Sequence, residues 1–241
     1  MATPRRCAII GAGRIGTILG ARLLSAGWEV RYGSRDPAHS RSLKHALKAQ
    51  PGASGSRIDD AVEWAGRGGA VLLAVPGSAL ASEAACAALA RSLGPFAAGK
   101  VVVDATNPLD SELNELVWER GRSSAEVLQE ALPESFVFKA FNSVGVEHMA
   151  APDAKLVTGQ RLTLMYAGAE ERARDVGELI AAVGFEPQYV GHIRYARNLE
   201  ALAELYIHLG AGRGGAHWAA PDGTRPFHFQ VLRRQRAASE E

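Results

Sequence analysis

The sequence has few cysteines, almost no net charge and no long hydrophobic run. Only Cys7 and Cys86 occur among 241 residues, which is too few for a disulfide framework and fits a reducing compartment. The 27 basic and 26 acidic residues leave a formal charge of +1, which gives no electrostatic basis for nucleic acid or an anionic membrane as the main partner. No stretch approaches the ~20 apolar residues that span a bilayer, and the chain enters a strand pattern without the apolar region of a signal peptide. We therefore expect a soluble cytoplasmic protein.

The chain contains a regular alternation of apolar strand patterns with helical patterns. Strands are expected within residues 7–13, 29–34, 69–76, 100–108, 135–143, 161–168 and 185–190. Helices are expected at residues 14–26, 36–48, 78–93 and 169–183. The segment Pro51–Arg57 has the composition of a surface loop. This alternation predicts an α/β protein whose mostly parallel sheet carries helices on both faces.

From Arg194 the pattern changes to one long apolar helix, followed by a glycine-rich turn and the basic tail "FHFQVLRRQR". We therefore predict a dinucleotide-binding domain at residues 1–190 and a small helical C-terminal extension at residues 191–241, which would contribute to the substrate pocket. The helix has an apolar stripe at helical spacing, made of Leu199, Leu202, Leu205, Tyr206 and Leu209. The stripe predicts a contact between the two subunits of a homodimer. The alternative is that the stripe packs on the sheet of its own chain.

The first chemical motif is Gly11-Ala12-Gly13-Arg14-Ile15-Gly16, which follows an apolar strand and opens an amphipathic helix. In this context Gly11 permits a tight turn, Gly13 lets the backbone approach a pyrophosphate, and Gly16 lets helix and strand pack closely. The helix N-terminus offers unpaired N–H groups to the phosphates. The motif predicts a Rossmann-type doubly wound fold that binds a dinucleotide.

The second expected strand lacks the acidic residue that would hydrogen-bond an adenine ribose. It ends on Gly33, Ser34 and Arg35, where a hydroxyl and a guanidinium suit the 2′-phosphate of NADP(H). Asp36 would favour NAD if it contacted the ribose, but the following Pro37 indicates that Asp36 caps the next helix. His39, about one turn into that helix, is either a second polar contact to the cofactor or simply exposed.

Three later strand ends should converge on the nicotinamide, because ligands of open parallel sheets bind beyond the carboxyl ends of the strands. They are "AVPGS" (74–78), "DATNPL" (104–109) and "FKAFNSVG" (138–145). Val75 and Pro76 are expected to pack on the cofactor, and Asn107, Asn142 and Ser143 to hydrogen-bond cofactor or substrate, or to serve as turn residues. Asp104 is either a buried carboxylate with a shifted pKa or a residue that ties down its loop.

These segments resemble the NADPH-dependent reductases of 8-hydroxy-5-deazaflavin, a family of NADP oxidoreductases. The similarity rests on "IIGAGRIGTILGARLLSAGWEVRYGSR", "VVVDATNPL", "VFKAFNSVG" and "RNLEALAELYIHLGAG", which occur in the order expected for that family. The resemblance implies that Ala12, Arg14, Ile15, Ser34 and Arg35 contact NADP(H), with Val75, Ala105 and Asn142 near the nicotinamide. His39 stands roughly where the family often has lysine. The implied co-substrate is a deazaflavin or flavin, although some members of the family use other substrates.

Two other dehydrogenase families share the glycine-rich motif. The β-hydroxyacid dehydrogenases need a catalytic lysine on a helix after the dinucleotide domain, whereas the last lysine here is Lys155. Pyrroline-carboxylate reductases have a longer helical C-terminal domain with a hydroxyl-rich motif, which is not found after Arg194. Glu204 and His208 are spaced for one helical face, but no HExxH motif or cysteine cluster accompanies them, so no metal site is expected.

The sequence therefore predicts an NADP(H)-dependent oxidoreductase that passes hydride between the nicotinamide and a planar ring such as a deazaflavin or flavin. The alternatives are an NADPH-dependent reductase of a small carbonyl or imine, and a non-catalytic NADP(H)-binding sensor. No histidine, cysteine or tyrosine lies in the three strand-end segments as a proton donor, so positioning should dominate catalysis. Alanine at Asp104, Lys139, Asn142 or Ser143 is expected to lower turnover modestly, and a bulky side chain at Gly13 or Gly145 to do more harm.

Overall fold

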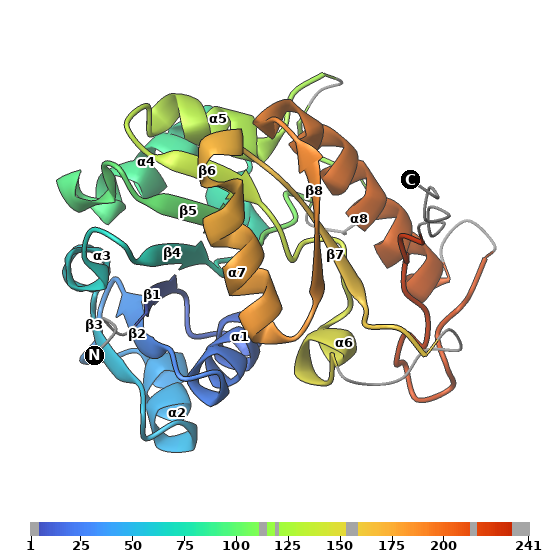
Figure 1. Ribbon diagram of the computed structural model, residues 1–241, viewed down its shortest axis with the longest axis horizontal. Coiled ribbons are helices and arrows are strands. Elements are labelled where there is room, and N and C mark those ends of the chain that lie inside the picture. The colour runs from blue at the N-terminus through green and yellow to red at the C-terminus, as the bar shows by residue number, and fades with distance from the viewer. Residues whose placement is uncertain (1–4, 111–114, 119–120, 153–158, 213–215, 233–241) are drawn as a thin grey trace, which may run out of the picture.

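The computed structural model describes residues 5–110, 115–118, 121–152, 159–212 and 216–232. Lys155 and the arginines of the tail, Arg233, Arg234 and Arg236, lie outside these described residues. Within them, the chain forms one eight-stranded sheet with helices on both faces (Figure 1). The predicted α/β fold of Rossmann type is confirmed.

The strand order is β3-β2-β1-β4-β5-β6-β7-β8. The strands are β1 (Arg6–Ile10), β2 (Glu29–Ser34), β3 (Ser54–Arg57), β4 (Ala70–Leu73), β5 (Val101–Asp104), β6 (Phe136–Lys139), β7 (Thr163–Ala167) and β8 (Glu186–Gly191). The first six strands are parallel, and their order reverses between β1 and β4. A crevice for a ligand is expected at that reversal, beyond the carboxyl ends of the strands.

Eight α-helices and four short 3₁₀ turns occur among the described residues. The α-helices are α1 (Arg14–Ser25), α2 (Arg41–Ala49), α3 (Ile58–Ala65), α4 (Glu83–Leu93), α5 (Ser124–Ala131), α6 (Val146–Ala150), α7 (Ala173–Val183) and α8 (Ala196–Ala211). The 3₁₀ turns are η1 (Gly77–Leu80), η2 (Pro95–Ala97), η3 (Glu170–Arg172) and η4 (Ile193–Tyr195). The helices α3, α5 and α6 were not among those predicted from the sequence.

Two apolar clusters cover the two faces of the sheet. Along β1, Cys7 and Ile9 join the cluster formed with α1, α2, α6 and α7, while Ala8 and Ile10 join the cluster formed with α3, α4 and α5. This alternation arises because successive side chains of a strand point to opposite faces. Helix α7 lies in front of the sheet in Figure 1, and α8 runs beside β7 and β8. Both faces of the central strands are therefore buried.

Strand β7 departs from the parallel arrangement that the sequence alternation suggested. It pairs antiparallel with β6 through Lys139 and Ala167, and β8 then runs parallel to β7. Of the segment between β6 and β7, the described residues contain the five-residue helix α6. The antiparallel pairing means that the chain enters β7 from the end at which it left β6.

Three other local predictions need correction. Helix α2 begins at Arg41 rather than near Asp36, because the side chain of Ser40 accepts the N–H of Leu43 and caps the helix. The expected helix 78–93 divides into η1 and α4, since Ser82 caps α4 through the N–H of Ala85. The segment expected as a loop ends in β3, an edge strand of polar residues and glycine that the period-two apolar pattern cannot reveal.

The C-terminal extension is helical only in its first part. Helix α8 ends at Ala211, and residues 216–232 have no helix or strand. This segment instead packs back on the sheet and α8, where Gln230 accepts the N–H of Thr163 and Phe227 accepts the hydroxyl of Tyr206. Side-chain hydrogen bonds, and not a regular pattern, hold it in place.

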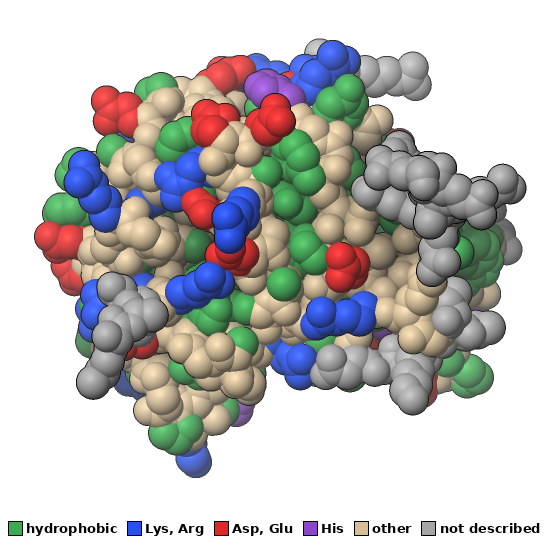
Figure 2. All heavy atoms as spheres, viewed as in Figure 1, with side chains coloured by type: hydrophobic (Ala, Val, Ile, Leu, Met, Phe, Trp, Pro, Cys, Tyr) green, Lys and Arg blue, Asp and Glu red, His purple; other side chains and the backbone are tan. Residues whose placement is uncertain are grey.

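Acidic and basic side chains alternate over the face seen in Figure 2, without a broad region of one sign. None of the helices in the described parts of the chain is long and apolar enough to cross a membrane.

Cys7 provides a test of the core at alkaline pH. Burial raises the pKa of its thiol from the ordinary 9.0 to about 12, so its contribution to stability is complete below pH 9.0 and is lost as pH rises toward 12. We expect the difference in unfolding free energy between wild type and Cys7→Ala to shrink by about 1.4 kcal/mol per pH unit in that range. Urea unfolding under reducing conditions measures this difference. An Ile9→Val control should show a cost independent of pH, and a constant cost for Cys7→Ala would contradict the prediction.

Candidate functional site: a dinucleotide cavity at the strand ends

The glycine-rich turn joins β1 to α1 at the point where the strand order reverses. Gly11 has φ +106°, a conformation that favours glycine, and its N–H donates to the carbonyl of Gly33 on β2. A Cβ atom at Gly16 would overlap the carbonyl oxygen of Gly11, whereas one at Gly13 would meet nothing within 4 Å. The turn is therefore closed on its protein side by Gly11 and Gly16 and open on its outer side at Gly13.

A cavity of about 500 Å³ lies in front of this turn. Its walls are the glycine-rich turn, the end of β2, the start of α2, the start of α3 and the loop after β4. The residues that line it are Ile10, Gly11, Ala12, Gly13, Arg14, Ile15, Gly33, Ser34, Arg35, Ser40, Ser42, Ile58, Ala74, Val75 and Pro76. Nine of the fourteen predicted cofactor contacts thus line one cavity, although their contact with a cofactor stays a prediction.

The cavity has positive and no negative side chains on its walls. Arg14 and Arg35 are exposed, and neither forms a hydrogen bond or ion pair with any described residue. The first N–H groups of α1 also lack acceptors within the helix and point toward its N-terminal end. Such a surface suits an anion that carries more than one phosphate group.

Asp36 does not cap a helix, which corrects the expectation drawn from Pro37. Its carbonyl accepts the N–H of Ser40, and its carboxylate accepts the N–H of His39 at 3.2 Å and contacts Nδ1 of that ring at 2.9 Å. These contacts close a turn before α2. Neither Asp36 nor His39 lines the cavity, so the phosphate contact of His39 stays a prediction.

Ser40, Ser42 and Ile58 also line the cavity, and sequence reasoning missed them. Ser40 is the N-cap of α2 and its hydroxyl contacts that of Ser42 at 3.2 Å. A serine three residues before an apolar position, here Ser40 before Leu43, is a capping signal. It could have placed the predicted start of α2 at Arg41. Ile58 had no comparable signal, because it reaches the cavity only through the packing of α3 on β2.

Besides His39, four predicted contacts do not line the cavity. Gly16 lies behind the turn, in α1, and Ala105, Asn107 and Asn142 lie on the loops after β5 and β6. The backbone of Asn107 packs directly against Gly77, the residue after Pro76, so its loop continues the wall beyond the cavity. Asn107 Nδ2 donates to the carbonyl of Asn142, and Asn142 Nδ2 donates to the carbonyl of Leu199 on α8. These two side chains tie loops together, while Asn142 Oδ1 and Thr106 Oγ1 are buried without a described partner.

Beneath these loops lies a fully buried ion cluster. Lys139 Nζ is 2.9 Å from Asp104 Oδ2 and 2.9 Å from Glu200 Oε1, and all three side chains are at most 1% exposed. Asp104 also accepts the N–H of Thr106 and so ties down its loop, which is one of the two roles predicted for it. Burial opposes the charge on Lys139, but the two carboxylates outweigh it and hold its pKa above the usual value.

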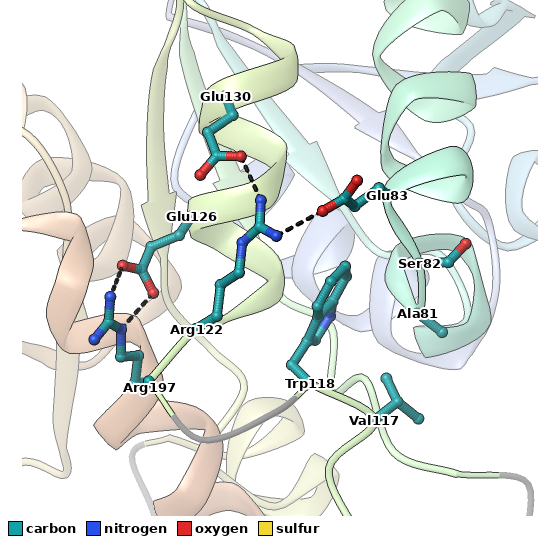
Figure 3. A pocket seen from close by; sticks show the side chains of 10 residues that line it. Ala81, Ser82, Glu83, Val117, Trp118, Arg122, Glu126, Glu130 and Arg197 are labelled. Carbon is teal, nitrogen blue, oxygen red and sulfur yellow. Dashed lines mark hydrogen bonds and ion pairs between the residues drawn. The ribbon is translucent and has the colours of Figure 1, made fainter.

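A second cavity, of about 650 Å³, lies between α4, α5 and α8 and includes none of the predicted site residues. Figure 3 shows that its charged groups pair with one another: Arg122 reaches Glu83 and Glu130, and Arg197 reaches Glu126. These arginines are already neutralised, unlike Arg14 and Arg35. Among the described residues, no group of three or more histidine, cysteine, aspartate or glutamate side chains is placed to hold a metal ion.

Comparisons with known proteins show what this chain is similar to. Residues 6–108, which include the glycine-rich turn and every residue that lines its cavity, match the model of a family described as NADP oxidoreductase, coenzyme F420-dependent. The metalloreductase STEAP3 of Rattus norvegicus is 28% identical over 194 residues, which cover 80% of this chain and 35% of the rat protein. The chain thus spans about a third of that relative's length.

Solved structures extend the similarity to the rest of the chain. A candidate F420-dependent NADP reductase from Arthrobacter sp. FB24 is 26% identical, with a TM-score of 0.77 over 94% of this chain and 99% of that one. A reductive aminase from Aspergillus terreus in complex with NADPH and ethyl-5-oxohexanoate is 21% identical, with a TM-score of 0.56 over 87% of this chain and 62% of that one. That second likeness concerns the fold alone.

The match of residues 6–108 to the F420-dependent NADP oxidoreductase family, together with the fold shared over nearly the whole chain, supports an NADP-dependent oxidoreductase as the broad class of this protein.

Proposed function

We propose that the protein transfers hydride between NADPH and a deazaflavin or flavin acceptor. The observation that carries the proposal is the cavity at the strand ends, where two unpaired arginines and a glycine-rich helix N-terminus face a space without carboxylates. Ser34 and Arg35 would hold the 2′-phosphate, with Ser40 and Ser42 beside them, and the turn 11–16 would hold the pyrophosphate. The preference for NADPH over NADH follows from these groups.

The nicotinamide half of the cofactor would lie against the loops beyond Pro76. The dinucleotide would cross the crevice from the β2 side to the β4 and β5 side, past Val75 and toward the loop of Asn107. The buried, unpartnered Asn142 Oδ1 and Thr106 Oγ1 at this end would suit the carboxamide of the ring, after a small rotation of either side chain. When bound, NADPH supplies the hydride.

The residues of this chain would therefore bind, orient and exclude water rather than exchange protons. Hydrogen bonds fix the loops that carry Asn107, Asn142 and Ser143. Fixed loops suit a reaction whose barrier depends on the distance between two rings. In the alternative, a reductase of small imines or carbonyls, one of these loops would have to supply a proton. A non-catalytic NADP(H)-binding sensor is the alternative outside enzymes.

One experiment separates these possibilities. Pure protein is incubated with NADPH or NADH and a panel of acceptors, namely a deazaflavin, a flavin, a cyclic imine, a small ketone and a ferric chelate, while nicotinamide absorbance is followed. Oxidation of NADPH by the deazaflavin or flavin supports the proposal. Turnover with the imine or ketone alone, or tight NADPH binding without turnover, favours the respective alternative. Absence of NADPH binding would overturn the proposal.

Gly13 offers a direct test of the phosphate cradle. We expect Gly13→Ala to leave the melting temperature unchanged, because the new methyl group meets no protein atom within 4 Å. Affinity for NADPH should fall at least about tenfold, since the methyl group occupies the space through which a pyrophosphate approaches the backbone. Calorimetric titration measures the affinity. Gly68→Ala, which also meets no atom within 4 Å, is the control and should bind NADPH normally.

We also propose a homodimer formed through α8. Leu199 and Tyr206 of the predicted stripe are buried within the chain, but Leu205 remains 50% exposed. We expect sedimentation equilibrium at micromolar concentration to show a dimer that Leu205→Glu dissociates, because a charge would be buried in an apolar contact. Phe96→Glu, at an exposed apolar residue away from α8, should leave the dimer intact. A monomeric wild type would contradict the proposal.

A further inference from the structure

The buried ion cluster contains two carboxylates and only one ammonium group. Lys139 pairs with Asp104, and this pair alone would be neutral. Glu200 adds a second carboxylate, which accepts from Lys139 Nζ, from the backbone N–H of Ser124 and from the Ser124 hydroxyl. One ammonium against two carboxylates gives the cluster a formal charge of −1. Burial of an unneeded charge is costly, which suggests a role beyond packing.

The cluster lies directly behind the loops proposed to surround the nicotinamide. Asp104 is the last residue of β5 and Lys139 is the last residue of β6, so the loops 105–109 and 140–145 begin at the cluster. Glu200 follows Leu199, whose carbonyl accepts the side-chain N–H of Asn142. Phe141, between Lys139 and Asn142, has φ 64° and is 1% exposed, which holds this loop in a strained conformation.

Electrostatics decides which redox form of the cofactor this charge favours. The nicotinamide ring is neutral in NADPH and positively charged in NADP⁺. The three charged side chains are at most 1% exposed, so solvent and salt screen their field weakly. A net negative charge behind the ring therefore stabilises the oxidised form.

We propose that Glu200, by making the buried cluster anionic, biases the site toward the oxidised nicotinamide and so favours hydride donation by NADPH. This inference rests on the proposed function and adds a direction to it. Glu200 acts through the field and through Lys139, and does not touch the reacting atoms. Sequence reasoning missed it, although an acid on the same helical face as the buried Ala196 and Ala203 is a signal of a buried charge.

The test compares the affinities of three ligands. Glu200→Gln keeps the shape of the side chain and leaves Lys139 paired with Asp104, so it removes the excess charge without stranding the ammonium. We expect the ratio of the NADP⁺ to the NADPH dissociation constant to rise about threefold to tenfold, and the affinity for 2′,5′-ADP, which lacks the nicotinamide, to stay within about twofold. The shift should persist at high salt, because the charge is buried.

Two further variants make the result decisive. Asp104→Asn removes the same charge from the other side of Lys139 and should shift the ratio in the same direction, which keeps the test open if Glu200→Gln does not fold. Glu130→Gln removes a charge from the exposed pair with Arg122 and should leave the ratio unchanged (Figure 3). Unchanged ratios in both cluster variants, with 2′,5′-ADP still bound, would overturn the inference. Failure of the wild type to bind either NADPH or 2′,5′-ADP would instead overturn the proposed function, and with it this inference.

Discussion

Replacing Arg35 with alanine is expected to weaken NADPH binding about tenfold to a hundredfold and to leave NADH binding nearly unchanged. The reason is that a charge-assisted hydrogen bond to a phosphate contributes ~1.5–3 kcal/mol, and only NADPH carries the 2′-phosphate. Arg35 lines the cavity and has no partner among the described residues, so its guanidinium is available without breaking an ion pair. Fluorescence titration of both cofactors measures the effect.

Arg91→Ala is the matched control for Arg35. Arg91 is an exposed arginine in the last turn of α4, away from the cavity, so its loss changes the net charge equally. Its removal should change neither affinity. Equal affinity of the wild type for NADPH and NADH would show that Ser34 and Arg35 do not bind a 2′-phosphate, and the cofactor assignment would then be wrong.

Lys139→Met is expected to destabilise the protein by about 3–5 kcal/mol, because it strands two carboxylates in the core. Asp104 and Glu200 would lose their shared ammonium at a site that water does not reach. Thermal unfolding measures the loss. Restoring neutrality with Asp104→Asn and Glu200→Gln in the same chain should recover part of the stability.

Arg197→Met tests whether burial, rather than pairing alone, causes the effect of Lys139→Met. Arg197 pairs with Glu126 at 2.6 Å, but its side chain is 39% exposed (Figure 3). Its removal should cost a small fraction of the Lys139 effect, since water replaces a partner at an exposed site. A Lys139→Met variant as stable as Arg197→Met would show that the cluster is not a stabilising ion network.

The burial of Lys139 and Asp104 also changes how the turnover of their alanine variants must be interpreted. A modest loss of turnover was expected because positioning, rather than proton transfer, was predicted to dominate catalysis. With both side chains inside the core, stability is the first property that alanine would affect. Ser143 and Asn142, which pair with no buried charge, remain the cleaner positions for testing positioning by turnover.

The sequence alone determined the fold class, the glycine-rich turn and the two arginines of the cavity. These features are local: a strand passes into a helix through Gly11, Gly13 and Gly16, and Arg35 follows the next strand directly. Each depends on residues within one β–α unit, so the spacing of the motif is enough to place them.

Only the tertiary structure decided the direction of β7 and the membership of the ion cluster. Glu200 lies 61 residues after Lys139 and 96 after Asp104, and nothing in that spacing indicates contact. Likewise the polar edge strand β3 forms because its backbone pairs with β2, not because its side chains favour a strand. Local sequence patterns indicate whether a residue prefers the buried or the exposed face of its helix or strand. The pairing of distant charges and of strand edges depends instead on which elements pack together, and that is fixed only when the chain folds.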